Sequence, residues 1–447
     1  MANKAIVNNQ FRIYTAQKFI EALLETQLSN NNLFLWVGKV IEWATEADPD
    51  QPHDTVTGRI GSFADMIAIK KVSPSDASLV LPRYDWTATT VYAQYSNLGI
   101  LVGSIRYDQY EPLTASAPFF VMNSVRNVYK CLWNNSGGAS SNEPTGTSTS
   151  PFTTADGYIW KYMYTISSSE AQRFLTDDWM PVRAIIANDG SNQWSVQQTA
   201  IAGQIEKVIV TAPGTLYTTA PTVTVLTGDG TGFAATATVG SGAVTGITVT
   251  NKGTGYTFMT LGLSGGGGSG ATTLAIISPP GGHGSDAVAE LGAMYVIVNV
   301  KLQFTESGKM TVDNDFRKFG LLLNPLRYGT SSLYTSLFGT LTTNITLVDV
   351  VGTYEADEIV EGADSEATGV VVDFDAGTGV LRLTSVLGTF EVGEIIEGAD
   401  SEAVGEVDEI ANPDIKANSG MILVTEHAEP TVRADDQSED FKIVLTL

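Results

Sequence analysis

The stretch Glu361-Gly362-Ala363-Asp364-Ser365-Glu366-Ala367 recurs without change at Glu397 to Ala403. Each copy follows a Gly-Thr-aromatic step, at Gly352 or at Gly388, so a repeat with a spacing of 36 residues runs from Gly352 to Val407. Short runs of β-forming residues lie between its acidic turns. Short strands separated by turns and repeated in this way predict a small inserted β module, which we assign to residues 346–411.

This module concentrates the charge of the chain. From Gly352 to Ala411 there are 16 acidic residues and one basic residue, Arg382, so the segment carries −15 of the net charge of −24. We therefore expect an acidic exterior, which would repel nucleic acid and anionic lipid. The spacing Asp373-x-Asp375-x-Gly377 resembles the start of a calcium loop, but Thr384 stands where a bidentate glutamate is needed. A solvated acidic hairpin is the favoured interpretation, and weak cation binding by the acidic turns stays open.

A second repeat, rich in glycine and threonine, precedes the acidic one. Ile205 to Tyr217 aligns with Val244 to Tyr256 at a spacing of 39 residues, which predicts a small antiparallel sandwich over 205–280. The pattern Gly265-x-Gly267-x-x-Gly270 matches a dinucleotide-binding loop, and Gly262-x-Ser264-x-Gly266 matches a nucleophile elbow. Both motifs require a helix after the loop, whereas Ala271 to Ile277 has the composition of a strand. We interpret both as a glycine turn.

The remaining sequence predicts a mixed framework. All seven tryptophans precede residue 195. We predict a helix over Thr15 to Gln27 with Thr15 as its N-cap, and a strand over Leu33 to Val40. Phe119 to Met122 and Val128 to Trp133 should form a hairpin. The alternating aromatics from Tyr158 to Tyr164 predict a buried strand face. Ser167 with Glu170 predicts a capping box.

Together these patterns predict a mainly β protein with a few helices, of the α+β class. We expect a discontinuous core domain with inserted small β-sandwich modules. The predicted domains are a composite core of 1–90 with 290–345 and 412–447, a second core domain at 91–204 with mixed β structure and a short helix, and the inserts at 205–280 and 346–411.

The inventory of reactive residues is short. A single cysteine, Cys131, excludes an intramolecular disulfide and a thiolate zinc site. His53, His283 and His427 are isolated in the sequence, so no nucleophile and base are placed together. No apolar run approaches the length of a membrane span, and the polar N-terminus does not read as a signal peptide. We expect no enzyme activity, no cofactor, no metal and no small-molecule substrate, in a protein made in a reducing cytoplasm.

A collinear set of short motifs resembles one family, the baseplate wedge protein called gene product eight in T4-type contractile-tailed phages. The motif residues taken as structural site residues are Leu81, Pro82, Arg83, Asp85, Trp86, Asp156, Gly157, Tyr158, Trp160, Asn324, Pro325, Gly420 and Met421. The resemblance covers about 1–185, 290–330 and 412–447, and leaves out both repeat inserts.

The resemblance implies a non-enzymatic scaffold located in the virion tail baseplate and assembled in the host cytoplasm. It implies a double-Greek-key-like core domain built by the N- and C-terminal parts together, and a homodimer that contacts other baseplate wedge proteins. The net charge of −24 predicts no nucleic acid or membrane as partner. From the residues themselves, Arg83 and Asp85 are expected to pair near Trp86 and to hold a corner of the core. Two alternatives stay open: a tail-fibre or adhesin-like protein that binds host glycans, and a polysaccharide depolymerase with a carboxylate pair in a cleft.

Overall fold

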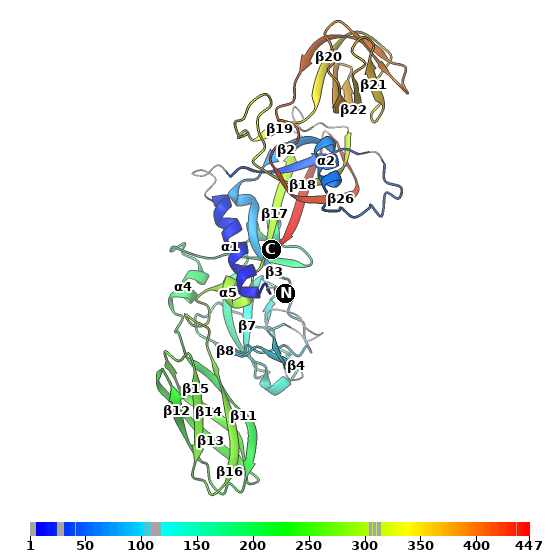
Figure 1. Cartoon of the computed structure of the whole chain (residues 1–447). Coiled ribbons are helices and arrows are strands. Elements are labelled where there is room, and N and C mark those ends of the chain that lie inside the picture. Colours follow the sequence, from blue (N-terminus) through cyan, green and yellow to red (C-terminus); the bar gives the residue numbers. More distant parts are fainter. Residues whose placement is uncertain are drawn as a thin grey trace, which may run out of the picture. The chain divides into compact units, whose positions relative to one another are not determined.

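The computed structural model describes residues 6–24, 31–40, 42–102, 105–107, 118–303, 306, 310, 314–434 and 436–447. Strands predominate in these ranges, so the predicted mainly β class is confirmed. The described α-helices are α1 (Asn9–Leu24), α2 (Val56–Asp65), α3 (Ser168–Phe174), α4 (Asn192–Gln198) and α5 (Ala287–Leu291), most of them labelled in Figure 1.

The chain divides into two compact units. The first comprises Met1–Gln17, Ser78–Val296 and Thr446–Leu447, and the second comprises Lys18–Ala77 and Ile297–Leu445. The first unit includes the Gly/Thr-rich repeat and the second includes the acidic repeat. The boundary near residue 77 differs from the predicted boundary at 90, because strand β3 (Ala77–Pro82) pairs with β10 (Trp179–Val182).

The second unit is built on a five-stranded antiparallel sheet with the order β19-β2-β1-β18-β26. Its strands are β1 (Leu33–Gly38), β2 (Met66–Lys71), β18 (Asn314–Leu323), β19 (Phe338–Thr340) and β26 (Met421–Arg433). Every residue of β1 is buried, which explains its continuous apolar sequence. A Cβ at Gly320 would overlap the Val424 carbonyl oxygen, so close strand packing requires glycine there. Strands from both ends of the chain thereby share one sheet.

Two further strands of the second unit lie side by side in another sheet. Strand β17 (Tyr295–Gln303) neighbours β27 (Ser438–Thr446), and the Asn299 side chain donates to the Asp440 carboxylate between them. The alternating residues Phe441, Ile443 and Leu445 of β27 are buried. The period-two pattern at the C-terminus thus marks one buried face of a strand.

The first unit contains a four-stranded sheet with the order β6-β7-β9-β8. Its strands are β6 (Phe120–Met122), β7 (Asn127–Trp133), β8 (Phe152–Thr153) and β9 (Ile159–Thr165). The predicted hairpin is confirmed by the β6–β7 pairing, and the predicted aromatic face is buried at Tyr158, Trp160, Tyr162 and Tyr164. A short hairpin of β4 (Ile100–Val102) and β5 (Ile105–Tyr107) precedes this sheet. Ser167 and Glu170 form the predicted capping box of α3.

The prediction for the N-terminal helix is wrong at its start. Helix α1 begins at Asn9, and the Asn8 side chain accepts a hydrogen bond from the Phe11 backbone amide at 2.9 Å. Thr15 lies inside the helix, where its hydroxyl donates to the Phe11 carbonyl one turn earlier. Asparagine is as good an N-cap as threonine, and the apolar spacing alone did not distinguish the two positions. The predicted end at Gln27 lies outside the described residues.

The Gly/Thr-rich repeat forms two antiparallel sheets, as a sandwich requires. One has the order β13-β14-β11-β16 and the other pairs β12 with β15. Their strands are β11 (Ile205–Thr215), β12 (Thr222–Gly228), β13 (Thr231–Gly240), β14 (Ala243–Thr254), β15 (Met259–Ser264) and β16 (Ser269–Ile277). Tyr217 and Tyr256, the tyrosines that end the two aligned segments, are both buried in its core. Gly265 and Gly267 lie in the β15–β16 turn at positive φ, and a strand follows, so the glycine-turn interpretation is confirmed.

The acidic repeat is a closed barrel with the order β20-β23-β22-β21-β24-β25, so a sandwich is the wrong prediction for this insert. Its strands are β20 (Thr343–Val351), β21 (Ile359–Gly362), β22 (Thr368–Asp375), β23 (Val380–Leu387), β24 (Ile395–Gly398) and β25 (Val404–Ala411). Each half contributes three strands, and pairing of β20 with β25 closes the sheet without leaving an edge.

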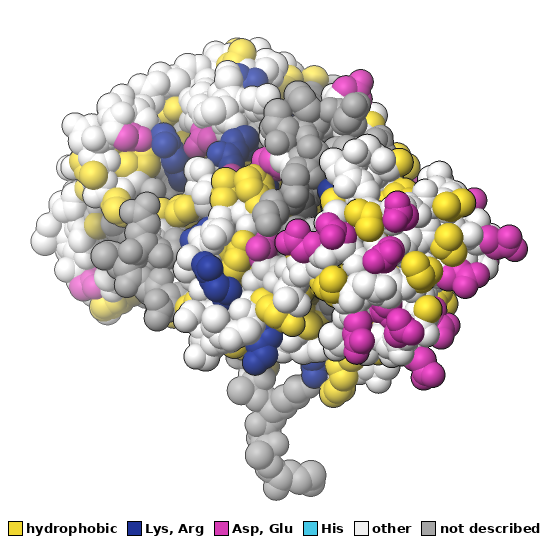
Figure 2. Space-filling model, turned by 90° about the horizontal axis from the view of Figure 1, so that it is seen from above, with side chains coloured by type: hydrophobic (Ala, Val, Ile, Leu, Met, Phe, Trp, Pro, Cys, Tyr) yellow, Lys and Arg dark blue, Asp and Glu magenta, His cyan; other side chains and the backbone are white. Residues whose placement is uncertain are grey.

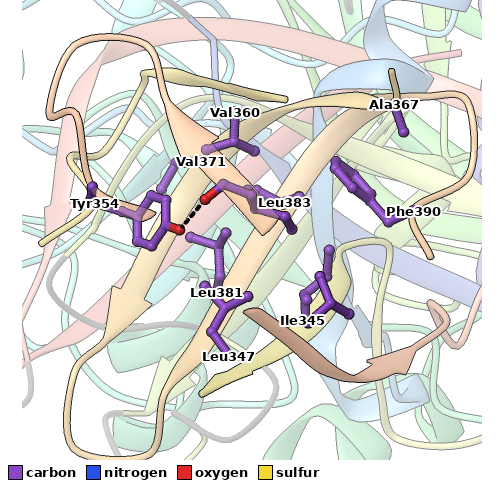
Figure 3. Close-up of a cluster of buried hydrophobic side chains, with 12 residues drawn as sticks. Ile345, Leu347, Tyr354, Val360, Ala367, Val371, Leu381, Leu383 and Phe390 are labelled. Atoms are coloured by element: carbon purple, nitrogen blue, oxygen red, sulfur yellow. Dashed lines mark hydrogen bonds between the residues drawn. The ribbon is translucent and has the colours of Figure 1, made fainter. Parts of the chain in front are cut away.

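The barrel core reflects the duplication residue by residue. Its buried side chains, most of them labelled in Figure 3, form pairs 36 residues apart: Ile345 and Leu381, Leu347 and Leu383, Tyr354 and Phe390, Val360 and Ile396, Ala367 and Ala403, Val371 and Val407. The repeat therefore begins earlier than its visible acidic part and includes β20 and β23. The Tyr354 hydroxyl donates to the Ile396 carbonyl at 2.8 Å, which joins the two halves in the core.

Candidate functional site

Several motif residues of the first unit meet around the Asp156 carboxylate. It accepts hydrogen bonds from the Ser140 hydroxyl at 2.9 Å and from the backbone amides of Ser141 at 2.8 Å and Asn142 at 3.0 Å. The Trp86 indole donates to the same Ser140 oxygen at 3.1 Å. Asp156 thereby fastens the loop before β8 to the strand that carries the aromatic core.

Two neighbours of Asp156 complete this arrangement. Gly157 adopts a φ of 82°, and a Cβ there would lie 3.0 Å from the Asn135 side chain. The Tyr158 hydroxyl donates to the Gly138 carbonyl at 2.6 Å and accepts from the Tyr92 amide. Its ring stacks on Trp160 with centroids 5.5 Å apart. The motif from Asp156 to Trp160 thus positions a loop and a buried aromatic cluster.

Arg83 and Asp85 pair as expected, with Nη2 and Oδ2 2.8 Å apart. The Arg83 guanidinium also donates to the Thr176 carbonyl at 2.8 Å, and its backbone amide donates to Asp178. Pro82 is the last residue of β3, and Leu81 is fully buried. This motif therefore fixes the corner where β3 leaves its partner β10.

The later motif residues meet in the second unit. Asn324 exchanges two hydrogen bonds with Asn32, one through its amide and one through its side-chain oxygen. Gly420 adopts a φ of 84°, and a Cβ there would lie 2.7 Å from the Leu323 carbonyl and 3.0 Å from Pro325. Met421 pairs with Leu323 in the sheet. Residues almost 100 positions apart thus close the end of β18.

The acidic turns of the barrel are filled by glutamates that the sequence analysis did not single out. Glu394 accepts from the Asp364 amide at 3.2 Å, the Ser365 amide at 3.0 Å and the Ser365 hydroxyl at 3.0 Å. Glu358 makes the equivalent hydrogen bonds to Asp400 and Ser401 in the other copy. Each repeat therefore supplies the anion that the turn of the other repeat binds.

This exchange explains why both repeats keep the same spacing between the glutamate and the turn, and why each turn has a glycine at Gly362 or Gly398. Burial raises the pKa of Glu358 and Glu394, but hydrogen bonds from the opposite turn and from the preceding loop outweigh it and lower both values. A Cβ at Gly362 or Gly398 would overlap the bound carboxylate. The signal that could have found these residues is their own 36-residue spacing. The two turns are occupied by protein carboxylates, which argues against these turns as cation sites.

A buried group of charges lies in the first unit at Lys130 and Glu290. Lys130 Nζ is 2.8 Å from Glu290 Oε2, with both side chains buried, and 4.0 Å from the centroid of the Tyr95 ring. Burial raises the pKa of Glu290, but Lys130 and His283 together bring it down to about 2. The Gly284 amide also donates to Glu290 at 2.7 Å. Glu290 is thus an ionised, fully engaged carboxylate.

His283 lies in a turn and belongs to this buried group, so it is neither a surface residue nor isolated in the fold. Its Nδ1 lies 3.8 Å from Glu290 and its Nε2 lies 3.7 Å from Glu206. Burial and the nearby Lys130 charge lower its pKa, so the ring is neutral near pH 7. The Gly-Gly-His-Gly sequence hides this position, because glycines on both sides remove any periodic signal.

Two cavities are relevant to the three histidines of the chain. One, of about 640 Å³, is lined in part by Tyr95, Asn97, Ser278 and Glu290, and its only buried carboxylate is the one already bound by Lys130. The other, of about 900 Å³, is lined in part by His53 and His427. His427 stacks on Trp43 with centroids 4.9 Å apart. Within the described ranges, no three His, Cys, Asp or Glu side chains are arranged to hold a metal ion.

No protein-family model matches this chain, and no curated protein shows significant similarity to it. Among the described helices, none has the length and apolarity needed to cross a bilayer. The geometry of the motif residues is therefore the main guide to function. It places them at two sites in the first unit, around Asp156 and around Arg83, and at one site in the second unit, around Asn324.

Proposed function

We propose that this protein is a structural subunit of a phage tail baseplate wedge. In this proposal it is a dimeric scaffold that binds neighbouring wedge proteins during baseplate assembly and host attachment. The observation that carries the proposal is the collinear motif set, whose members build two hydrogen-bonded corners around Asp156 and Asn324. Motifs of this kind fix loops and strand ends in a rigid framework, and a scaffold protein needs such a framework to bind its neighbours.

The hydrogen-bonded and ion-paired carboxylates support a structural role over a catalytic one. A general acid or base needs a free proton position and a pKa near the working pH. Glu290 is ion-paired with Lys130 and has a pKa of about 2, and Asp156 accepts several hydrogen bonds. Glu358 and Glu394 are likewise occupied by the turns that they bind. These carboxylates hold parts of the fold together.

The proposal is tested first by location. Antibodies against the full chain, applied to purified contractile tails of the phage that encodes it, should label the baseplate, and a density map of that baseplate should contain the acidic barrel. Light scattering of the purified full chain should give a dimer. Label along the fibres, a trimer in solution and binding to host glycans would instead support the tail-fibre or adhesin alternative. Turnover of host polysaccharide would support the depolymerase alternative.

A further inference from the structure

We propose that the outer face of β21 and β24 in the barrel is a docking surface for a protein partner that inserts an arginine or lysine side chain framed by apolar side chains. This inference concerns the barrel alone and does not depend on the proposed function. It rests on the register of the barrel strands, on the exposure of their outward side chains and on unbalanced charge.

The strand register places six residues in one row across the barrel. Thr368 pairs with Leu387 and with Glu361, Glu361 pairs with Glu397, and Val404 pairs with both Glu397 and Val351. Directly paired residues of neighbouring strands point to the same side of a sheet. The row therefore reads Leu387, Thr368, Glu361, Glu397, Val404 and Val351, with the two glutamates at its centre.

The central glutamates are an unfavourable pair within the protein itself. Both are exposed and directly opposite each other, and like charges in this position destabilise a sheet. Arg382, the basic residue of the module, is engaged with Asp373 on β22. Within the described part of the chain, neither Glu361 nor Glu397 forms an ion pair. A cation supplied from outside would remove this repulsion.

Apolar side chains frame the glutamates on both sides. Ile359 and Ile395 each lie two residues before one of the glutamates on the same strand face, and they are 54 and 42% exposed. Leu387 and Val351 end the row and are 72 and 67% exposed. Figure 2 shows acidic side chains gathered at the right of the view with hydrophobic side chains between them. Apolar residues beside a polar centre are typical of a protein interface.

The duplication defines what fits this surface. Glu361 and Glu397 occupy the same position in the two copies, as do Ile359 and Ile395, and Val351 and Leu387. The surface is thus two equal halves that meet at the carboxylate pair. A guanidinium offers donors on more than one side, so one arginine can bind both carboxylates, with lysine a weaker substitute. A second copy of this face would bring carboxylates against carboxylates, which excludes the same face as its partner.

A methyl-resolved titration of the full chain tests the proposal. Isoleucine δ-methyl groups are labelled, and the Ile359 and Ile395 signals are assigned with Ile→Val variants. The probe is the peptide acetyl-Gly-Leu-Thr-Arg-Thr-Val-Gly-amide, with glutamine in place of arginine as the matched control peptide. We expect saturable shifts of both signals with the arginine peptide, and about tenfold weaker binding when Glu361→Gln and Glu397→Gln are combined.

The control variant combines Glu366→Gln with Glu402→Gln. It removes the same charge from exposed, repeat-related positions in the acidic turns, and its affinity should stay within about twofold of the unmodified chain. The proposal is overturned if the arginine peptide leaves both signals unmoved, or if both peptides bind equally. Equal loss of affinity in the two variants would show general charge attraction only. Saturation by calcium ions in place of the peptide would show a cation site.

Discussion

At Asp156 a single carboxylate joins a loop, a tryptophan and an aromatic core. Burial raises the pKa of Asp156, but hydrogen bonds from Thr154, Asn142, Ser141 and Ser140 outweigh it and bring the value to about 2. The pKa in the folded protein is thus below its ordinary value of 3.8. The carboxylate therefore stabilises the fold above pH 4 and loses this contribution as the pH falls towards 2.

We expect Asp156→Ala to lower the free energy of unfolding by about 2 kcal/mol at pH 7, because several donors lose their acceptor. Urea denaturation followed by tryptophan fluorescence measures this loss, and the difference from the unmodified chain should shrink below pH 4. Asp408→Asn, at an exposed position of the barrel, serves as the control and should change stability by less than about 0.5 kcal/mol. A similar loss from both variants would contradict the assigned role.

For the buried ion pair of Lys130 and Glu290, we expect the single Lys130 substitution to cost more stability than the double substitution. Lys130→Met alone should cost about 3–5 kcal/mol, because it leaves an unpaired buried carboxylate. Adding Glu290→Gln should recover part of that loss, since glutamine stays neutral and its carbonyl oxygen can still accept from the Gly284 amide. Urea midpoints of the single and double variants measure the difference. A double variant less stable than Lys130→Met would mean that the Glu290 charge has another essential partner.

The barrel is a duplicated three-stranded unit, and each half supplies one glutamate to the turn of the other half. Glu358 binds the turn at Ser401, and Glu394 binds the turn at Ser365. The two halves are thus joined through polar ends as well as through the core. This reciprocity makes the halves interdependent.

We expect Glu394→Gln to remove hydrogen-exchange protection from the Asp364 and Ser365 amides, and Glu358→Gln to do the same at Asp400 and Ser401. Each substitution should cost about 1–3 kcal/mol, because an amide donor of glutamine meets the donors of the turn. The pKa of both glutamates is lowered from 4.5, so barrel stability should fall as the pH drops below that value. Loss of protection in the turn of the same repeat would refute the exchange.

The second unit depends on chain segments from both ends of the chain. Strand β26 is the edge of its five-stranded sheet and pairs with β18, which in turn pairs with β1. Phe441 of β27 packs on Phe316 and Phe319 with ring centroids 5.6 and 5.1 Å apart. The C-terminal strands thus cover both the edge of β18 and its side chains.

Deletion of 419–447 should therefore unfold the sheet of the second unit, because β18 loses its edge partner and an aromatic neighbour together. Hydrogen exchange at residues 33–38 measures this effect, and those amides should lose protection. A deletion that leaves them protected would show that β1, β2 and β18 are stable without the C-terminus. Phe441→Ala in the full chain separates the two contributions, because it removes the packing and keeps the strand pairing.

Local sequence patterns predicted several elements of this fold correctly. Alternating residues predicted the buried aromatic strand at Tyr158 to Tyr164, the EGADSEA turns predicted a duplicated β module, and Ser167 with Glu170 predicted a helix start. These features depend on neighbours in the sequence, so periodicity and turn chemistry reveal them. Long-range packing specifies that the acidic module closes into a barrel, that Glu358 and Glu394 fill opposite turns, and that His283 is buried beside Glu290. Those contacts join residues that the chain keeps apart, and no local pattern specifies which distant partner a buried charge will meet.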